Sequence, residues 1–314
     1  MGLIPKPTVA VLSLIVLIAL PQTSCAEKDK IYETSARQMI PWTELIFKGS
    51  KFFTSTTLKI KLGLGGQLSD DLSTEIGTDN CDYSENLYNS KLLTVQSSTR
   101  GVGFSQNQYE EKVWFKETTF GPYKRVRLNS GDVPWVKSYY WGDKGVRREK
   151  IFPGNPSENK QAPVTWTKRT ESFYEYPEEV TGCDTISDPS LIFYILSAFQ
   201  PVRQSKSFEI CVFGRKQLHR MTIVQEKYSS LKVSYKSRSA SQEVIVEGKI
   251  TPTVFSITTK TFLPRESEQE IFSFLGLHRD IRIYMDPEKR LPVRITGRNN
   301  SFGGVTLDLR SYSR

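Results

Sequence analysis

Short segments that alternate apolar and polar residues follow one another along most of the chain, and this pattern limits the fold more than any other feature. In Phe52–Leu64, FFTSTTLKIKLGL, the side chains of Leu58, Ile60 and Leu62 would share one face of a strand, with two lysines opposite. Gly, Pro, Asn and Asp separate such segments, and WGDKGV at Trp141–Val146 marks a reversal. We therefore expect a mainly β fold: a large, twisted antiparallel sheet or half-barrel meander.

One segment breaks this pattern. In Ser187–Phe199, SDPSLIFYILSAF, Asp188 is suited to the N-cap and Pro189 to the first helical position. The apolar residues at helical spacing are Leu191, Ile192, Ile195, Leu196 and Phe199. We predict one helix at about residues 188–199 that covers the apolar face of the sheet.

The last strands have the clearest pattern in the chain. Asp286–Lys289, DPEK, is a turn sequence, since Pro at the second position presets φ. Beyond it, alternate apolar residues share a face on each of two strands: Leu291, Val293 and Ile295, then Val305, Leu307 and Leu309. A three-stranded ending that completes a sheet is predicted.

The first 26 residues have the pattern of a secretory signal. Lys6 precedes an uncharged and almost wholly apolar run of about 12 residues, Val9–Leu20, which is short for a membrane span. Ser24-Cys25-Ala26 offers small residues for cleavage before Glu27. A second interpretation is that Cys25 is lipidated, as in bacterial lipoproteins. A third is that the segment is an uncleaved anchor. All three options take the chain out of the cytoplasm, to the periplasm or the outer-membrane side of the envelope.

The chain is basic, with 43 Lys and Arg against 34 Asp and Glu and a net charge of +9, or +8 without Lys6. A basic exported protein meets anionic envelope surfaces more readily than nucleic acid. The basic residues are scattered among acids, which is also typical of an ordinary soluble surface.

Three cysteines follow the expected leader: Cys81, Cys183 and Cys211. An odd number excludes a fully paired set, and their spacing matches no metal motif. Cys183 and Cys211 flank the predicted helix, so they are the candidates for a disulfide. The alternative is three buried thiols that act as small apolar residues.

The sequence divides into a lead-in at 27–50, an N-terminal antiparallel β half at 51–180 and a C-terminal β half with the helix at 181–314. In the last part, YMDPEKRLPVRITG…FGGVTLDL and DPSLIFYILSAFQPV resemble the bacterial envelope family known as domain of unknown function 3108. The resemblance covers roughly Gly182–Leu309. It implies a periplasmic antiparallel fold similar to the lipoprotein-carrier proteins, whose curved sheet can hold an acyl chain, and it supplies no catalytic residue.

Motifs for catalysis, metals and cofactors are missing from the sequence. The two histidines, His219 and His278, belong to no H-E-x-x-H motif, and there is no G-x-S-x-G elbow. The glycines of Leu62–Asp71, LGLGGQLSDD, lack the Lys-Ser/Thr end of a phosphate loop. We expect no enzyme activity and no cofactor. An envelope hydrolase with dispersed carboxylates stays the alternative.

Aromatic residues on neighbouring predicted strands are the candidate ligand site: Trp114, Trp135, Tyr139, Trp141 and Trp166. In YEEKVWFKETTF, Val113 and Phe115 face one way and Trp114 the other. These aromatics would either line an apolar groove or pack as core on both faces of the sheet. The functional expectation is a non-catalytic exported envelope protein that binds a lipid, a lipoprotein or another amphipathic molecule.

Overall fold

The structure is a computed structural model that describes residues 39–51, 54–66, 87, 89–101, 104–177, 180, 182–198, 206–262, 272–300 and 303–314. The predicted leader at 1–26 with Cys25, the first half of the lead-in at 27–38, and Cys81 lie outside these residues. All described elements belong to one compact unit, Thr34–Arg314.

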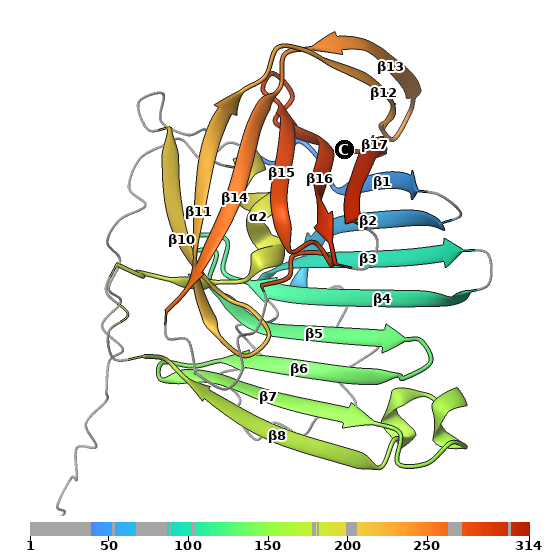
Figure 1. Cartoon of the computed structure of the whole chain (residues 1–314), viewed down its shortest axis with the longest axis vertical. Helices are drawn as coiled ribbons and strands as arrows, with labels where there is room; N and C mark the ends of the chain where they lie inside the picture. Colours follow the sequence, from blue (N-terminus) through green and yellow to red (C-terminus); the bar gives the residue numbers. More distant parts are fainter. Residues whose placement is uncertain are drawn as a thin grey trace, which may run out of the picture. The chain divides into compact units, whose positions relative to one another are not determined.

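The N-terminal half is a meander in which each strand pairs antiparallel with the next (Figure 1). Its strands are β1 (Glu44–Lys51), β2 (Thr54–Leu64), β3 (Lys91–Gly101), β4 (Phe104–Phe115), β5 (Pro122–Ser130), β6 (Trp135–Trp141), β7 (Gly145–Phe152) and β8 (Lys168–Glu175). Two short 3₁₀ turns, Glu158–Lys160 and Pro163–Thr165, lie between β7 and β8. The predicted antiparallel meander is confirmed here.

The C-terminal half departs from a simple meander. Its strands are β9 (Ile186–Ser187), β10 (Ser207–Phe213), β11 (Leu218–Lys227), β12 (Leu231–Arg238), β13 (Glu243–Ile250), β14 (Thr253–Thr261), β15 (Arg279–Asp286), β16 (Leu291–Asn299) and β17 (Gly303–Ser313). Strand β11 pairs with β14, so the β12–β13 hairpin does not lie between them, and β12 instead runs parallel to the end of β17. Strand β9 is parallel to β10.

Strand β17 joins the two halves because it pairs with β16 on one edge and with β1 on the other. The result is a mixed sheet of 17 strands that does not close into a barrel within the described residues. The predicted mainly β fold with a large, chiefly antiparallel sheet is confirmed.

The predicted helix is confirmed, and its α-helical part begins later than expected, whereas the predicted last residue, Phe199, lies outside the described residues. The Asp188 side chain accepts a hydrogen bond from the Ser190 backbone N–H at 2.8 Å, Pro189–Leu191 form a 3₁₀ turn, and α2 follows at Ile192–Ala198. All residues of α2 but the last are buried, so the helix is surrounded by protein and does not expose a polar face. We call the face of the sheet that packs on α2 the inner face and the opposite one the outer face.

Both halves contribute to one main core around α2. Phe193 contacts Phe47 of β1 and Phe274, with ring centroids 6.4 Å and 5.4 Å apart. Tyr194 meets Phe115 of β4 edge to face at 4.9 Å. The Trp42 indole N–H donates to the Ser197 hydroxyl at 3.0 Å. The helix therefore fills the space between the inner faces of the two halves.

The predicted ending is also present. The Asp286 carboxylate accepts the backbone N–H groups of Glu288 and Lys289, which fixes the DPEK turn. Beyond it, Val293 and Leu307 are buried, whereas Arg294 on the opposite face forms an ion pair with Asp308 at 2.6 Å.

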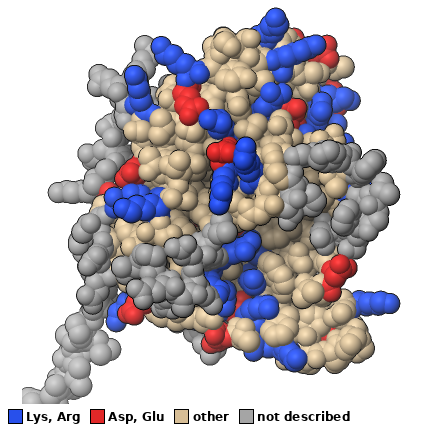
Figure 2. Space-filling view, in the orientation of Figure 1, with Lys and Arg blue, Asp and Glu red and all other residues tan. Residues whose placement is uncertain are grey.

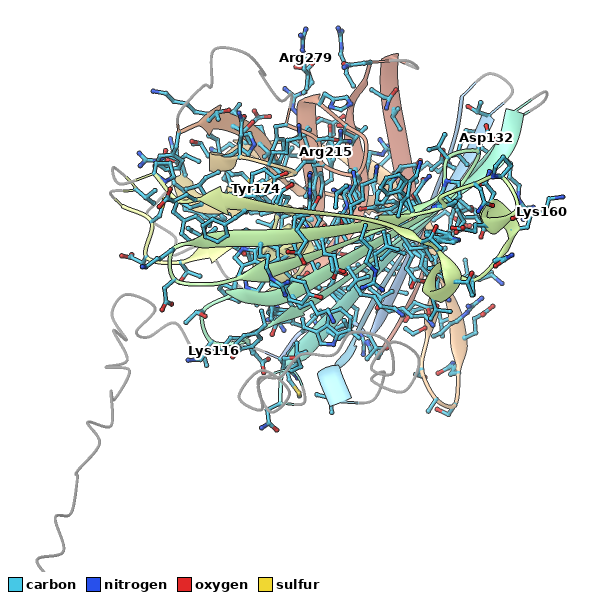
Figure 3. The ribbon with its side chains drawn as sticks, turned by 90° about the horizontal axis from the view of Figure 1, so that it is seen from below. Lys116, Asp132, Lys160, Tyr174, Arg215 and Arg279 are labelled. Atoms are coloured by element: carbon cyan, nitrogen blue, oxygen red, sulfur yellow. A yellow bond between two sulfur atoms is a disulfide. The ribbon has the colours of Figure 1, made fainter. Side chains whose placement is uncertain are left out.

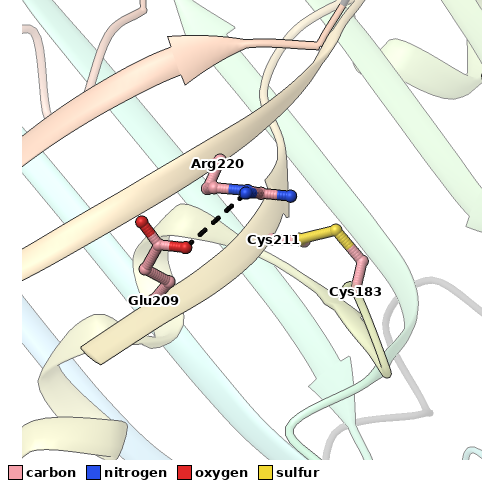
Figure 4. Close-up of a disulfide and its surroundings, with 4 residues drawn as sticks. All are labelled: Cys183, Glu209, Cys211 and Arg220. Atoms are coloured by element: carbon pink, nitrogen blue, oxygen red, sulfur yellow. Dashed lines mark ion pairs between the residues drawn. A yellow bond between two sulfur atoms is a disulfide. The ribbon is translucent and has the colours of Figure 1, made fainter. Parts of the chain in front are cut away.

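A disulfide joins Cys183 to Cys211 of β10, with Cα atoms 5.7 Å apart (Figure 4). The bond fixes the segment before β9 and the helix to the sheet. Close to it, an Arg220–Glu209 ion pair of 3.7 Å links β11 to β10.

Candidate functional site

Two adjoining cavities form a groove along the inner face. The first, of about 390 Å³, is lined by β1–β3, β16–β17 and the turn at Leu275–Leu277. The second, of about 300 Å³, is lined by side chains of β3–β6 together with Ser190 and Arg215. Ser97, Leu275 and Gly276 border both cavities, so we treat them as one site and call it the inner groove.

The first cavity exists because the inner face changes along the strands from large apolar side chains to small polar ones. On β2, the buried Ile60 and Leu58 are followed on the same face by Thr56. On β3, the buried Leu93 and Val95 give way to Ser97 in the same manner. Small hydroxylated residues leave space where large apolar ones would fill it. The apolar part of the wall comes from Leu58, Leu275, Leu277, Val305 and Leu307.

The turn that divides the groove has a special backbone. Leu275 and Gly276 have φ of +54° and +78°, and Phe274 and Leu277 on either side of them form an isolated antiparallel bridge. Two consecutive left-handed residues match a type I′ turn, which is uncommon for leucine. This conformation places Leu275 at the boundary of both cavities.

The second cavity is charged. At its base the Glu111 carboxylate accepts the Ser190 hydroxyl and the Tyr109 phenol and pairs with Arg127 Nε at 3.1 Å. Burial alone would raise the pKa of Glu111. The Arg127 and Arg125 guanidiniums and the two hydroxyl donors outweigh that effect and lower the pKa, so the carboxylate is ionised.

Arg125 connects several elements beneath the second cavity. Its Nη1 pairs with Asp188 Oδ2 at 2.6 Å, and its Nη2 donates to the Gly214 carbonyl oxygen at 2.6 Å. The guanidinium also lies over the Tyr139 ring, 4.0 Å from the centroid. Arg125 is 2% exposed and Asp188 is fully buried. These contacts hold β5, β6, the start of the helical segment and the β10–β11 connection together.

The five aromatic residues predicted as one ligand site do not lie together. Trp114 and Trp166 are buried on the outer face with Leu92, Val126 and Val136. Tyr139 and Trp141 pack on the inner face against Phe213. Only Trp135 borders the inner groove. Among the described residues, Trp114, Tyr139 and Trp166 are buried and Trp141 is partly buried against Phe213, which matches the interpretation of apolar packing on both faces.

Sequence reasoning missed the charged part of the groove. Glu111 is in phase with Val113 and Phe115 on β4, and Arg125 lies opposite Val113 on β5. A charged residue in phase with buried apolar residues is the signal that could have identified both. The polar lining of the first cavity gives no comparable signal, because Thr and Ser are common on ordinary strands.

Neither a metal site nor a spanning helix emerges from the described residues. No group of three or more His, Cys, Asp and Glu there is placed to bind a metal ion. No helix in that part of the chain is both long and apolar enough to cross a bilayer.

Comparison with known proteins leaves the family open. No protein-family model matches the chain, and no curated protein sequence matches it. A solved structure to which the chain is similar is a beta-barrel-like protein of domain of unknown function DUF1849 from Brucella abortus. The match has 7% identity and a TM-score of 0.38 and covers 86% of this chain and 95% of that one. This similarity is too low to assign a family or a ligand. The resemblance to domain of unknown function 3108 therefore stays a prediction.

Proposed function

We propose that this chain is a non-catalytic binding protein of the cell envelope whose ligand is an amphipathic molecule held in the inner groove. The observation that carries the proposal is the arrangement of the groove: a partly apolar cavity adjoins a charged one, with Leu275 between them. A molecule with an alkyl tail and a polar head would match a groove in which an apolar cavity lies next to a charged one.

The size and lining of the first cavity suit a tail. Small-molecule sites are concave, chiefly apolar and typically some 300–1,000 Å³ in volume. Transfer of each CH₂ from water contributes about 0.8 kcal/mol, so a tail of about ten carbons would gain on the order of 8 kcal/mol before ordering costs. The threonine and serine hydroxyls of the wall leave room for a chain or for ester groups near the head.

The cell envelope is part of the proposal because of residues outside the described part of the chain. The leader expected at 1–26 would deliver the protein to a compartment rich in amphiphiles. The protein's net charge, +9 or +8 without Lys6, would favour anionic amphiphiles. Figure 2 shows Lys and Arg side chains over much of one face, interspersed with fewer acidic ones.

The charged cavity supports binding more than hydrolysis. A glycoside hydrolase needs one carboxyl group that gives up a proton and one carboxylate that attacks or activates water. Here Glu111 pairs with Arg127 and Asp188 pairs with Arg125, and both carboxylates accept further hydrogen bonds. Carboxylates held in this way serve to orient cations.

A matched pair of variants tests the proposal. Thr56 lines the first cavity, whereas Thr57 lies on the outer face of the same strand. Thr56→Phe should fill the cavity and weaken saturable binding of a lysophospholipid at least tenfold, and Thr57→Phe should leave it unchanged. Affinity of the parent protein should rise with alkyl chain length. Equal binding by both variants, or no saturable binding by the parent, would overturn the proposal.

A further inference from the structure

Three strands carry cations directly opposite one another on the inner face. Arg127 of β5 is the register partner of Lys137 of β6, and Lys137 is the partner of Lys150 of β7. Directly opposed residues on one face of an antiparallel pair are close neighbours, and like charges in such pairs are destabilising. A row of three cations across three strands therefore needs a counter-charge.

Two more cations lie next to this row. Arg148 of β7 is two residues further along on the same face, opposite Tyr139, with its guanidinium 5.1 Å from the Tyr174 ring centroid. Its Nη2 donates to Ser172 Oγ at 3.0 Å, and its buried Nε has no hydrogen-bond partner among the described residues. Arg215 lines the second cavity together with Arg127, and Figure 3 shows it between β8 and the C-terminal strands. We call Arg127, Lys137, Arg148, Lys150 and Arg215 the basic row.

On the outer face of the same strands, by contrast, arginines form ion pairs with glutamates. There Arg147 of β7 pairs with Glu171 at 3.6 Å, and Arg169 of β8 pairs with Glu149 at 3.4 Å. In the described part of the chain, Lys137, Arg148 and Lys150 have no such ion pair with an acid. Of the acids on the inner face, Glu111 is already engaged by Arg127. On β6 and β7, the cations without an ion pair among the described residues thus lie on the inner face.

The titration of Lys137 is consistent with this concentration of positive charge on the inner face. Burial, followed by the charges of Arg127, Arg148, Lys150 and Arg215, lowers the pKa of the Lys137 ammonium to about 8. An anion bound among these groups would offset the repulsion that depresses this pKa.

Nearby aromatic rings hold the ammonium groups in place. Lys137 Nζ lies 4.2 Å from the centroid of the Trp135 ring, and Lys150 Nζ lies 4.3 Å from that of Phe152. Contacts of this kind favour a defined position of a cation over a mobile one. Because Trp135, Arg127 and Arg215 also line the second cavity, the basic row is continuous with the inner groove.

We propose that the basic row is a binding site for a phosphate-bearing anion with at least two negative charges, such as a phosphate monoester or a diphosphate. Guanidinium groups bind phosphate oxygens in pairs, and ammonium groups add point charges, so a mixed Arg–Lys set suits phosphate better than a single carboxylate. This inference rests on the proposed function where it assigns the phosphate as the head of an amphiphile. The anion site itself needs no tail.

The first experiment uses inorganic pyrophosphate and calorimetry at low, matched ionic strength. The parent should bind pyrophosphate more tightly than orthophosphate. The double variant Lys137→Gln/Lys150→Gln should lose at least tenfold in affinity, and its melting temperature should not fall, because a repulsion is removed. The control Arg147→Gln/Arg169→Gln removes the same charge from the outer face and should bind as the parent does. Equal loss in both double variants, or no binding by the parent, would overturn the site.

A second comparison separates this inference from the proposed function. Lysophosphatidic acid and a zwitterionic lysophospholipid with the same alkyl chain differ in the charge of the head. Preference for the former that disappears in Lys137→Gln/Lys150→Gln supports a phosphorylated amphiphile. Equal binding of both lipids by parent and variant would overturn the inference of a phosphate site and leave the proposed function intact. If pyrophosphate binds but neither lipid does, the anion site stands and the amphiphile proposal fails.

Discussion

Arg125 is a charged residue that is buried as deeply as the apolar core. Its guanidinium pairs with Asp188, donates to the Gly214 carbonyl and lies over the Tyr139 ring, so its partners come from segments far apart in the sequence. A buried ion pair of this kind contributes little net free energy compared with an apolar pair. Removal of one partner is nevertheless strongly destabilising, because the other charge stays buried alone.

Arg125→Met should therefore lower the free energy of unfolding by about 4 kcal/mol, since it leaves the Asp188 carboxylate unpaired. Urea unfolding followed by circular dichroism would measure the loss. The double variant Arg125→Met/Asp188→Asn should recover a substantial part of it, because the uncompensated charge is gone. A loss below about 1 kcal/mol for the single variant would show that solvent reaches the pair.

His219 makes stability depend on pH. The side chain is buried beside Thr261 and Phe272, and burial lowers the pKa of its imidazole from 6.5 to about 4. The unfolded chain thus takes up a proton before the folded chain does. Stability from this group is complete above pH 6.5 and is lost as the pH falls toward 4, by about 3 kcal/mol.

The free energy of unfolding should fall more steeply with decreasing pH in the parent than in His219→Gln. Between pH 6.5 and 4, the parent should lose about 3 kcal/mol more than the variant, whatever the variant's stability at pH 7. Unfolding midpoints in urea at several pH values give the comparison. Parallel curves for the two proteins would mean that the imidazole is protonated in the folded state.

At the scale of elements, α2 depends on its attachments more than on its length. An isolated helix of seven residues is unstable in water, so the Asp188 cap, the surrounding core and the disulfide must hold it. Arg290 adds to this attachment, since its guanidinium donates to the carbonyl oxygens of Ser197 and Met39. The helix is stabilised as part of the core and not by its own sequence.

The disulfide should contribute measurably to this arrangement. Cys183 and Cys211 are 28 residues apart, and a loop of that size corresponds to about 3.5 kcal/mol from restriction of the unfolded chain. Cys183→Ser/Cys211→Ser should lower the free energy of unfolding by about that amount, and reduction of the parent should have the same effect. Identical melting temperatures for the oxidised and reduced parent would contradict the bond.

For the molecule as a whole, local sequence patterns predicted the strands, the helix and the turns. Long-range contacts determine how the strands pair and where the groove forms. The alternation at Leu58 and Ile60, the cap at Asp188 and the DPEK turn are signals within a few residues, and each proved correct. The pairing of β11 with β14 and of β17 with β1 has no such signal, because many strands of similar pattern compete for each edge. The groove depends on both kinds of contact, and the 63-residue separation of Arg125 from Asp188 illustrates why its charged part escaped prediction.

The continuous sheet makes a prediction about the cooperativity of unfolding. Strand β1 pairs with both β2 and β17, and one core surrounds α2 from both halves. All five tryptophans precede residue 167, so their fluorescence reports chiefly on the N-terminal half, although Trp42 and Trp141 also contact Ser197 and Phe213 of the C-terminal half. Circular dichroism reports on the strands of both halves. If the sheet unfolds as one unit, the two signals should have the same urea midpoint.

A substitution in the C-terminal half makes this test decisive. Val293 of β16 is 3% exposed and remote in sequence from every tryptophan, so Val293→Asp buries an unpaired charge and should cost several kcal/mol. In a cooperative molecule it lowers the tryptophan midpoint as much as the dichroism midpoint. Arg294→Gln, on the opposite face, loses only a partly exposed ion pair with Asp308 and should change either midpoint little. If Val293→Asp moves the dichroism curve alone, with a plateau before the tryptophan change, the halves at 51–180 and 181–314 fold as separate units.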